Sequence, residues 1–476
     1  MNIDLNKNTI YLFEKIFLYV FLIYSILSSN SFTYGKGIIT YFMWASFGLG
    51  TVLLIYRLIN IKNYKKPGII FLLLMFISIC ISTIINYRYS FKGNVIFCIY
   101  WALFFFVIYL MNSNKDIILA FLKVFTVYVV VSSTISVILM YKGYSYIVVA
   151  PDTGYLFYQG FAIGRLWGVF INPNNGAISA ALSIVIMLYF VLENKNSLVK
   201  VLGVLGIINE IIYIAFTDSR SGAVCLGVLI ATYSFVVLWD KKKNIVKKSF
   251  IIVLSVIMLM VGFYLPRKTK DIYNASLTKI SEYKASKEVA PETPVLDNNV
   301  NDMDSISDDV EELVIDRGYD LSDDISNRRF DAWKSAIEIY ASSLKNIVFG
   351  VSFKGFTEYA LENLPSTYIV NNNYALFTTF DNEIFNILDA QGAIGIVSLF
   401  AIMAFVLFYI SKHIWKTNDI KLVALLVSVI FGMAASACFC SIMFYHFSPN
   451  GLLFWLVLGG LVSVFNEEEK EWGLML

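Results

Sequence analysis

Long apolar runs recur along the chain and alternate with short charged or turn-forming segments. Most runs reach the roughly 18 residues that a helix needs to cross about 30 Å of hydrocarbon. The pattern predicts about twelve membrane-spanning helices. They are expected at 10–28, 37–59, 68–86, 93–112, 116–140, 175–192, 198–216, 221–239, 249–265, 392–411, 421–444 and 451–465. No small-residue cleavage signature follows the first run, so we expect a retained span and not a removed signal peptide.

The predicted fold class is an all-α integral membrane protein in three parts. Residues 1–265 form a transmembrane bundle, 266–391 one large external loop, and 392–476 the last spans with a cytoplasmic tail. Composition agrees, because 58% of the 476 residues are hydrophobic and only 15% charged, whereas charged residues are about 25% of an ordinary soluble domain.

The net charge and the positions of the cysteines limit which partners and which kinds of binding site we expect. The net charge of +2 gives no nucleic-acid footprint. All five cysteines lie in or beside apolar runs and show no pairing with histidine of the kind that metal sites use. We therefore expect no nucleic-acid partner, no metal and no cofactor.

Basic residues predict the orientation. Four lysine-rich loops fall on one side of the membrane, which the positive-inside rule makes the cytoplasm: YRLINIKNYKKP, ENKNSLVK, DKKKNIVKK and SKHIWKTNDIK. Arg88 and Lys92 oppose this assignment but are outnumbered. Both termini are then cytoplasmic, and three polar segments are external: 141–174, 217–222 and 266–391.

The large external loop divides by composition. Residues 286–324 are dense in Asp and Glu with few aromatics, as in flexible, solvated tracts. Residues 327–350 regain helical spacing and predict a helix lying on the outer surface of the bundle. Four apolar side chains share one face of that helix: Phe330, Trp333, Ile337 and Tyr340.

Four arginines fall on the predicted outer side: Arg165, Arg220, Arg328 and Arg329. Arg165, in GRLWGVFINPNNGA, and Arg220, in TDSRSG, each precede a helix whose N-terminus faces outward. A guanidinium beside the free N–H groups of a helix N-terminus is suited to an anion. The two motifs predict a pyrophosphate site, although a single arginine here could equally be an interfacial anchor.

Several polar side chains are candidates for binding glycan. Asn172, Asn174 and Asn175 precede a predicted helix that needs only one cap, so the surplus amides could bind sugar or phosphate oxygens. Trp333 is a further candidate for glycan contact.

Three residues are candidate general bases. Asp381 and Glu383 directly precede an apolar helix, where Asp381 could instead be the helix cap. A carboxylate at a partly desolvated surface has its pKa raised toward the working pH. His446, at the outer end of a span, is the third candidate. Glu210, inside a predicted span, could relay protons or pair with a buried arginine.

The motifs RLWGVFINPNNGA, TDSRSG, RRFDAW, VFGVSFKGF and DNEIFNILDAQGAIGI follow one another in the chain. In this order and spacing they resemble the O-antigen polymerase and ligase superfamily, of Wzy-type polymerases and WaaL-type ligases, over about 160–400. The resemblance implies a metal-independent glycosyltransferase that uses undecaprenyl-pyrophosphate-linked glycans, with its active site on the outer face of the bacterial cytoplasmic membrane. Arg165 and Arg220 would hold the pyrophosphate, and Arg329 would contribute. Ligases carry His-Asn where this chain has Asp381 and Asn382, which favours a polymerase.

The predicted function is polymerisation of lipid-linked oligosaccharide repeat units into capsular or O-antigen polysaccharide. Expected partners are a lipid-linked donor and acceptor, membrane lipids, and flippase and chain-length regulator proteins. A ligase is the alternative within the same chemistry. A flippase or transporter is the alternative from another class, but such proteins usually show an internal repeat and polar groups at mid-membrane. A scaffold would leave polymer intact when Arg165 and Arg220 are replaced by Ala.

Overall fold

A computed structural model describes residues 7–60, 64–111, 115–149, 156–239, 245–288, 314–316, 328–371 and 377–473. Most of the predicted acidic tract, 286–324, lies outside these residues. Within them, eleven helices are long and apolar enough to cross a membrane, and α3 (Ile69–Ile85) is a shorter apolar helix. The prediction of an all-α multi-pass membrane protein is confirmed.

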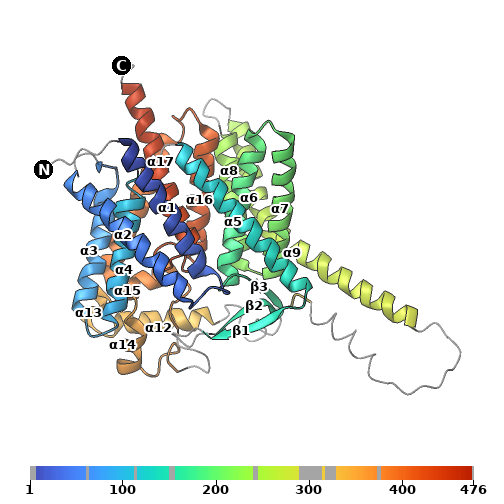
Figure 1. The fold of residues 1–476 in the computed structure, drawn as a ribbon, viewed down its shortest axis with the longest axis horizontal. Coiled ribbons are helices and arrows are strands. Elements are labelled where there is room, and N and C mark those ends of the chain that lie inside the picture. Colours follow the sequence, from blue (N-terminus) through green and yellow to red (C-terminus); the bar gives the residue numbers. More distant parts are fainter. Residues whose placement is uncertain are drawn as a thin grey trace.

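The helices form one bundle with two distinct ends (Figure 1). Both chain termini lie at one end, called here the termini end, and a small sheet lies at the other, called the sheet end. The long helices are α1 (Lys7–Ser29), α2 (Gly37–Ile59), α4 (Phe91–Leu103) with the π-helix η2 (Phe104–Ile108), α5 (Lys115–Tyr141), α6 (Pro173–Glu193), α7 (Ser197–Thr217), α8 (Arg220–Leu238), α9 (Ile245–Glu288), α15 (Glu383–His413), α16 (Ile420–Ala437) and α17 (Pro449–Gly473).

The sheet was not predicted. Three antiparallel strands, β1 (Ser145–Val149), β2 (Leu156–Ala162) and β3 (Arg165–Gly168), are ordered β1-β2-β3 within the segment expected to be only a polar external turn. Runs of aromatic and β-branched residues bounded by glycine are typical hairpin sequences. The β2–β3 turn has positive φ at Ile163 and Gly164, and it places Arg165 at the first position of β3.

Three predicted helix boundaries are wrong. α9 does not end at 265 but continues through Pro266. α15 begins at Glu383 instead of 392, with a break at Gly392, whose φ is 63° and ψ is −155°. α16 stops at Ala437, and the apolar residues 438–448 are irregular. Hydropathy cannot separate an apolar loop packed inside protein from a span, because non-helical backbone is tolerated where protein groups bind it.

Three short helices lie at the sheet end: α12 (Arg329–Ala341), α13 (Leu344–Phe349) and α14 (Phe356–Asn363). α12 and α13 lie within 327–350, where one surface helix was predicted. The protein-facing side of α12 is not the aromatic face, since Phe330 and Ile337 are exposed. Small buried residues, including Ala332 and Ala336, face the protein instead and let α12 pack closely against α15.

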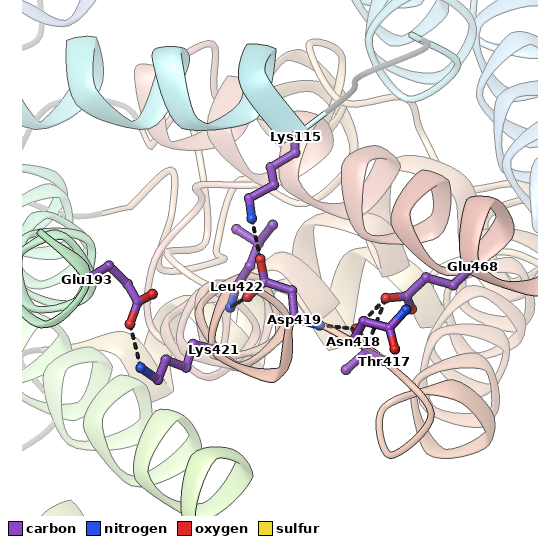
Figure 2. A network of polar contacts seen from close by, with 8 residues as sticks. All are labelled: Lys115, Glu193, Thr417, Asn418, Asp419, Lys421, Leu422 and Glu468. Carbon is purple, nitrogen blue, oxygen red and sulfur yellow. Dashed lines mark hydrogen bonds and ion pairs between the residues drawn. The ribbon is translucent and has the colours of Figure 1, made fainter. Parts of the chain in front are cut away.

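At the termini end, polar contacts tie four long helices together (Figure 2). Lys115 of α5 pairs with Asp419, which precedes α16. Lys421 of α16 lies 2.6 Å from Glu193 of α6. Glu468 of α17 accepts hydrogen bonds from the turn before α16. These contacts hold α16 and α17 in place at the termini end. At the sheet end, residues 438–448 connect the two helices.

The core of the bundle is formed by α6, α16 and α17, which are its most buried spans, whereas α2, α7 and α9 turn most of their apolar surface outward. In a membrane such surface faces lipid. Of these buried helices, α6 carries one of the polar motifs at its sheet end, whereas the other two motifs precede the less buried α8 and α15.

Candidate functional site

Arg165 connects the two arginine motifs. Its side chain is 6% exposed. Nε donates a hydrogen bond to the Thr217 carbonyl oxygen at 3.0 Å, and Nη2 donates to Asn174 Oδ1 at 3.1 Å. The Ser219 hydroxyl donates to the same Asn174 oxygen at 2.9 Å. The segments 164–177 and 217–222, separate in sequence, are therefore in direct contact at the sheet end.

Four long helices begin at the sheet end beside this contact. α6, α8 and α15 are capped by the side chains of Asn172, Ser219 and Asn382, each accepting a backbone N–H from the first turn. α17 is joined to α6 because Asn450 Nδ2 donates to the Asn175 carbonyl oxygen at 3.2 Å. Each helix N-terminus carries a partial positive charge and unpaired N–H groups, so their convergence favours an anion.

The three predicted glycan-binding asparagines have different surroundings. Asn172 Oδ1 is occupied by the backbone N–H of Asn174 at 2.8 Å. Asn175 binds Asn450 through its backbone. Asn174 presents its oxygen to Arg165, while its Nδ2 makes no hydrogen bond to any described residue. Asn174 is thus the asparagine with a half-buried donor available next to the arginine.

Glu383 anchors residues 438–448. Its buried Oε1 accepts three consecutive backbone N–H groups, from Ile442 at 2.8 Å, Met443 at 2.8 Å and Phe444 at 3.0 Å. This geometry gives Glu383 a structural function, and its candidacy as general base stays a prediction without geometric support.

Asp381 is not the cap of α15, because Asn382 occupies that position and accepts the Ile384 N–H at 2.9 Å. Asp381 itself is half-buried and adopts a φ of 51°. Burial raises the pKa of its carboxyl group, and the positive charge of Arg329 opposes that rise. The carboxylate makes no hydrogen bond to the described residues and is therefore open to a ligand.

Trp333 positions the backbone next to Asp381. The indole Nε1 of Trp333 donates to the Phe380 carbonyl oxygen at 3.0 Å. Its ring stacks on Phe385 with centroids 5.2 Å apart. The polar atom of Trp333 is thus used within the protein, so its predicted glycan contact is limited to the remaining ring surface.

Cys440 lies where the charged residues approach one another. Its Sγ is 3.5 Å from the Ser221 hydroxyl of α8. Burial raises the pKa of this thiol to about 12, and the charges acting on it are those of Asp381, Arg329 and Arg165. Two arginines and one carboxylate from three distant parts of the sequence therefore lie near enough to Cys440 to act electrostatically on its thiol. Nothing in the sequence identified Cys440, because residues 438–444 read as part of a span.

Arg220 has other neighbours. It lines a small cleft with Asp218, Ser219, Pro266 and Arg267. The sequence predicted that Arg165 and Arg220 hold one pyrophosphate. Ser219, which also lines the cleft, joins it to Arg165 through the Asn174 oxygen, and sharing of one pyrophosphate by Arg165 and Arg220 stays a prediction.

Two other candidates fit a proton-transfer function less well. Burial and the nearby Lys354 lower the pKa of His446 to about 4, so the ring is neutral near pH 7 and a weak base. Glu210 Oε1 accepts from the Ser133 hydroxyl at 2.6 Å and from Asn209 Nδ2 at 3.3 Å. Of the two functions open to Glu210, proton relay and pairing with a buried arginine, the second has no partner among the ion pairs of the described residues.

Comparison with known proteins agrees with the sequence motifs. Residues 202–400 match the family model Wzy_C, described as O-antigen ligase. The matched segment includes Arg220, Arg329 and Asp381 but not Arg165. No curated protein matches the chain. The resemblance to the O-antigen polymerase and ligase superfamily is confirmed, and it supports a glycosyltransferase-like membrane enzyme of O-antigen ligase or polymerase type.

Proposed function

We propose that this membrane protein, similar to the O-antigen polymerases and ligases, joins polyprenyl-pyrophosphate-linked oligosaccharide repeat units into a capsular or O-antigen-type polysaccharide. The reaction would occur at the sheet end, on the outer face of the bacterial cytoplasmic membrane. One observation carries the proposal: Arg165 joins the starts of α6 and α8, and Arg165, Arg329 and Asp381 all act electrostatically on the Cys440 thiol, which contacts Ser221 of α8. Two cations and one carboxylate supply both an anion site and a proton acceptor.

The two arginines stabilise the leaving group, which is the pyrophosphate of the donor. Arg165 and Arg329 bind the pyrophosphate of the lipid-linked donor, together with N–H groups at the helix N-termini. The Nδ2 group of Asn174 adds a neutral donor beside Arg165. Negative charge develops on the pyrophosphate as its bond to the sugar breaks, and groups fixed in advance stabilise that charge most.

The Asp381 carboxylate activates the nucleophile, which is a hydroxyl of the acceptor. A hydroxyl at the non-reducing end of the acceptor attacks the anomeric carbon of the donor. The new carbon–oxygen bond forms as the bond to pyrophosphate breaks, and polyprenyl pyrophosphate leaves with the electron pair. Asp381 takes the hydroxyl proton, since its carboxylate is open and its pKa is raised by burial. Attack opposite the leaving group inverts the anomeric centre.

A ligase is the second candidate, because the matched family is described as O-antigen ligase and the same anion site would hold the same donor. The residue before Asn382 favours the polymerase. Ligases of the superfamily have histidine there as their proposed base, and this chain has Asp381.

The test is the length distribution of surface glycan in cells that lack the gene. Parent protein should restore a ladder, whereas Asp381→Asn should leave single lipid-linked units. Asp331→Asn is the matched control, because Asp331 is exposed on α12 and should give the parent ladder. If cells lacking the gene accumulate long chains on the lipid carrier, the protein is a ligase. A ladder that persists with both Asp381→Asn and Arg165→Gln would refute catalysis by this site.

A further inference from the structure

The cleft that contains Arg220 is formed where three helices meet. α7 contributes Ile214 and Ala215 near its end, α8 contributes Arg220 at its first position, and α9 contributes Pro266 and Arg267. Arg267 has no assigned function in the mechanism above. Two guanidinium groups from different helices therefore line one cleft, outside the group formed by Arg165, Arg329 and Asp381.

Close packing of the α8 and α9 backbones places Arg220 and Arg267 at the same end of the helix pair. α8 and α9 cross at Gly227 and Gly262, where a Cβ on Gly262 would lie 2.6 Å from the Gly227 Cα atom. The helices run in opposite directions. Arg220 precedes Gly227 by about two turns and Arg267 follows Gly262 by about one and a half. Small residues at the crossing thus bring both arginines to the sheet end of the helix pair.

The described residues that line the cleft include two arginines, Arg220 and Arg267, and one acidic residue, Asp218. The Asp218 carboxylate is paired with Lys270 Nζ at 3.1 Å. Arg267 lies over the Phe263 ring with 4.3 Å between the guanidinium carbon and the ring centroid. That contact orients a cation without neutralising it. The N-terminus of α8 adds further positive potential.

The cleft lies at the end of a large apolar surface. On α9, Ile257, Val261 and Tyr264 are exposed, and on α7 Leu205 and Ile208 are exposed. These residues lead along both helices toward Arg220 and Arg267. A ligand with a long hydrocarbon tail and a phosphate head fits such a surface, because the tail can remain in lipid while the head meets the arginines.

We propose that the Arg220–Arg267 cleft binds the phosphate groups of a second polyprenyl-linked molecule, the acceptor. The inference rests on the proposed polymerase function, in which donor and acceptor each carry a lipid pyrophosphate. Arg165 and Arg329 hold the donor, and Arg220 and Arg267 hold the acceptor. A ligase, whose acceptor is another molecule, does not need this second site.

The test counts bound polyprenyl pyrophosphate by native mass spectrometry of the full chain in phosphatidylcholine nanodiscs. The parent should bind two molecules. Arg267→Gln should weaken one of them about tenfold, the loss expected for one charge-assisted hydrogen bond, and Arg267→Lys should recover part of it. Arg165→Gln should weaken the other. Lys268→Gln is the matched control, because Lys268 is an exposed neighbour that pairs with Asp271, and it should bind two.

Each other outcome has a definite meaning. If the parent binds one molecule that Arg165→Gln removes and Arg267→Gln leaves unchanged, the acceptor site is refuted and the donor site stands. If phosphatidylglycerol competes at the cleft as well as polyprenyl pyrophosphate does, the cleft is a phospholipid headgroup site and the inference is wrong. If the parent binds no polyprenyl pyrophosphate, the proposed function itself fails.

Discussion

Glu383→Gln should destabilise the fold more than it slows the reaction. The Glu383 Oε1 atom accepts three backbone N–H groups from 442–444. Hydrogen bonds to a charged group contribute about 1.5–3 kcal/mol each and those between neutral groups about 0.5–1.5 kcal/mol. Replacing the carboxylate by an amide should therefore cost about 3 kcal/mol over the three bonds.

The assay pairs stability with turnover. The free energy of unfolding would be measured by denaturant titration in mixed micelles, and the rate by elongation of lipid-linked repeat units in nanodiscs, per folded molecule. Asp381→Asn is the comparison, because it makes the same change of charge two residues away. Removal of a general base costs about 10²–10⁴ in rate, so Asp381→Asn should lose turnover while keeping its stability.

The reverse pattern would refute this reasoning. If Glu383→Gln has the same free energy of unfolding as the parent but a turnover rate more than about 100-fold lower, Glu383 is the base. The three amide contacts would then be incidental, and the function assigned to Asp381 would be wrong.

Three further predictions concern the pH profile, a buried ion pair and the helix crossing. Arg329→Gln removes the charge that opposes the burial-raised pKa of Asp381, so the pH below which the initial rate falls should move upward. Glu14→Gln leaves Arg57, 3% exposed, without its counter-ion and should cost about 3–5 kcal/mol in the denaturant titration, much of which the Glu14→Leu, Arg57→Leu double variant should recover. Gly262→Val should cost about 1–3 kcal/mol in the same titration by separating α8 from α9.

Each of these has a control. Arg329→Lys keeps the charge and should leave the pH profile near that of the parent, and a shift equal to that of Arg329→Gln would contradict the electrostatic explanation. Equal stability of the single Glu14 variant and the double variant would show that the ion pair is not buried as described. Gly48→Val adds the same side chain where no atom lies within 4 Å of the new Cβ, so a matching loss there would remove packing as the cause.

The sequence predicted most of the spans and proposed residues for the site, but it did not predict the helix boundaries around those residues. Hydropathy reports whether a residue avoids water, and it treats lipid and protein interior alike. It therefore extended α16 across 438–444, and it began α15 only at 392 because polar residues such as Asn386 and Asp389 lower the hydropathy of its buried first turns. Both errors hid the same feature, an irregular apolar segment held by Glu383.

Residue chemistry also could not distinguish the functions of neighbouring polar residues. Asp381, Asn382 and Glu383 are adjacent, and each is able to cap a helix, bind amides or take a proton. The structure assigns the cap to Asn382 and the backbone anchor to Glu383, which leaves Asp381 open beside Arg329. Distances to residues 438–444, more than fifty positions away, decide this division.

By itself the sequence determined that the chain is a multi-pass helical membrane protein in which Arg165 and Arg220 lie outside the apolar runs. Local composition suffices for that, because the cost of charge in hydrocarbon and the length of a span act within one segment. Only the tertiary structure decided which arginines have common neighbours. Arg165 and Arg220 stand in similar sequence motifs, yet Arg165 and Arg329 both act on the Cys440 thiol, whereas Arg220 and Arg267 line one cleft. That separation depends on how α6, α8 and α9 pack, a long-range property that local composition does not encode.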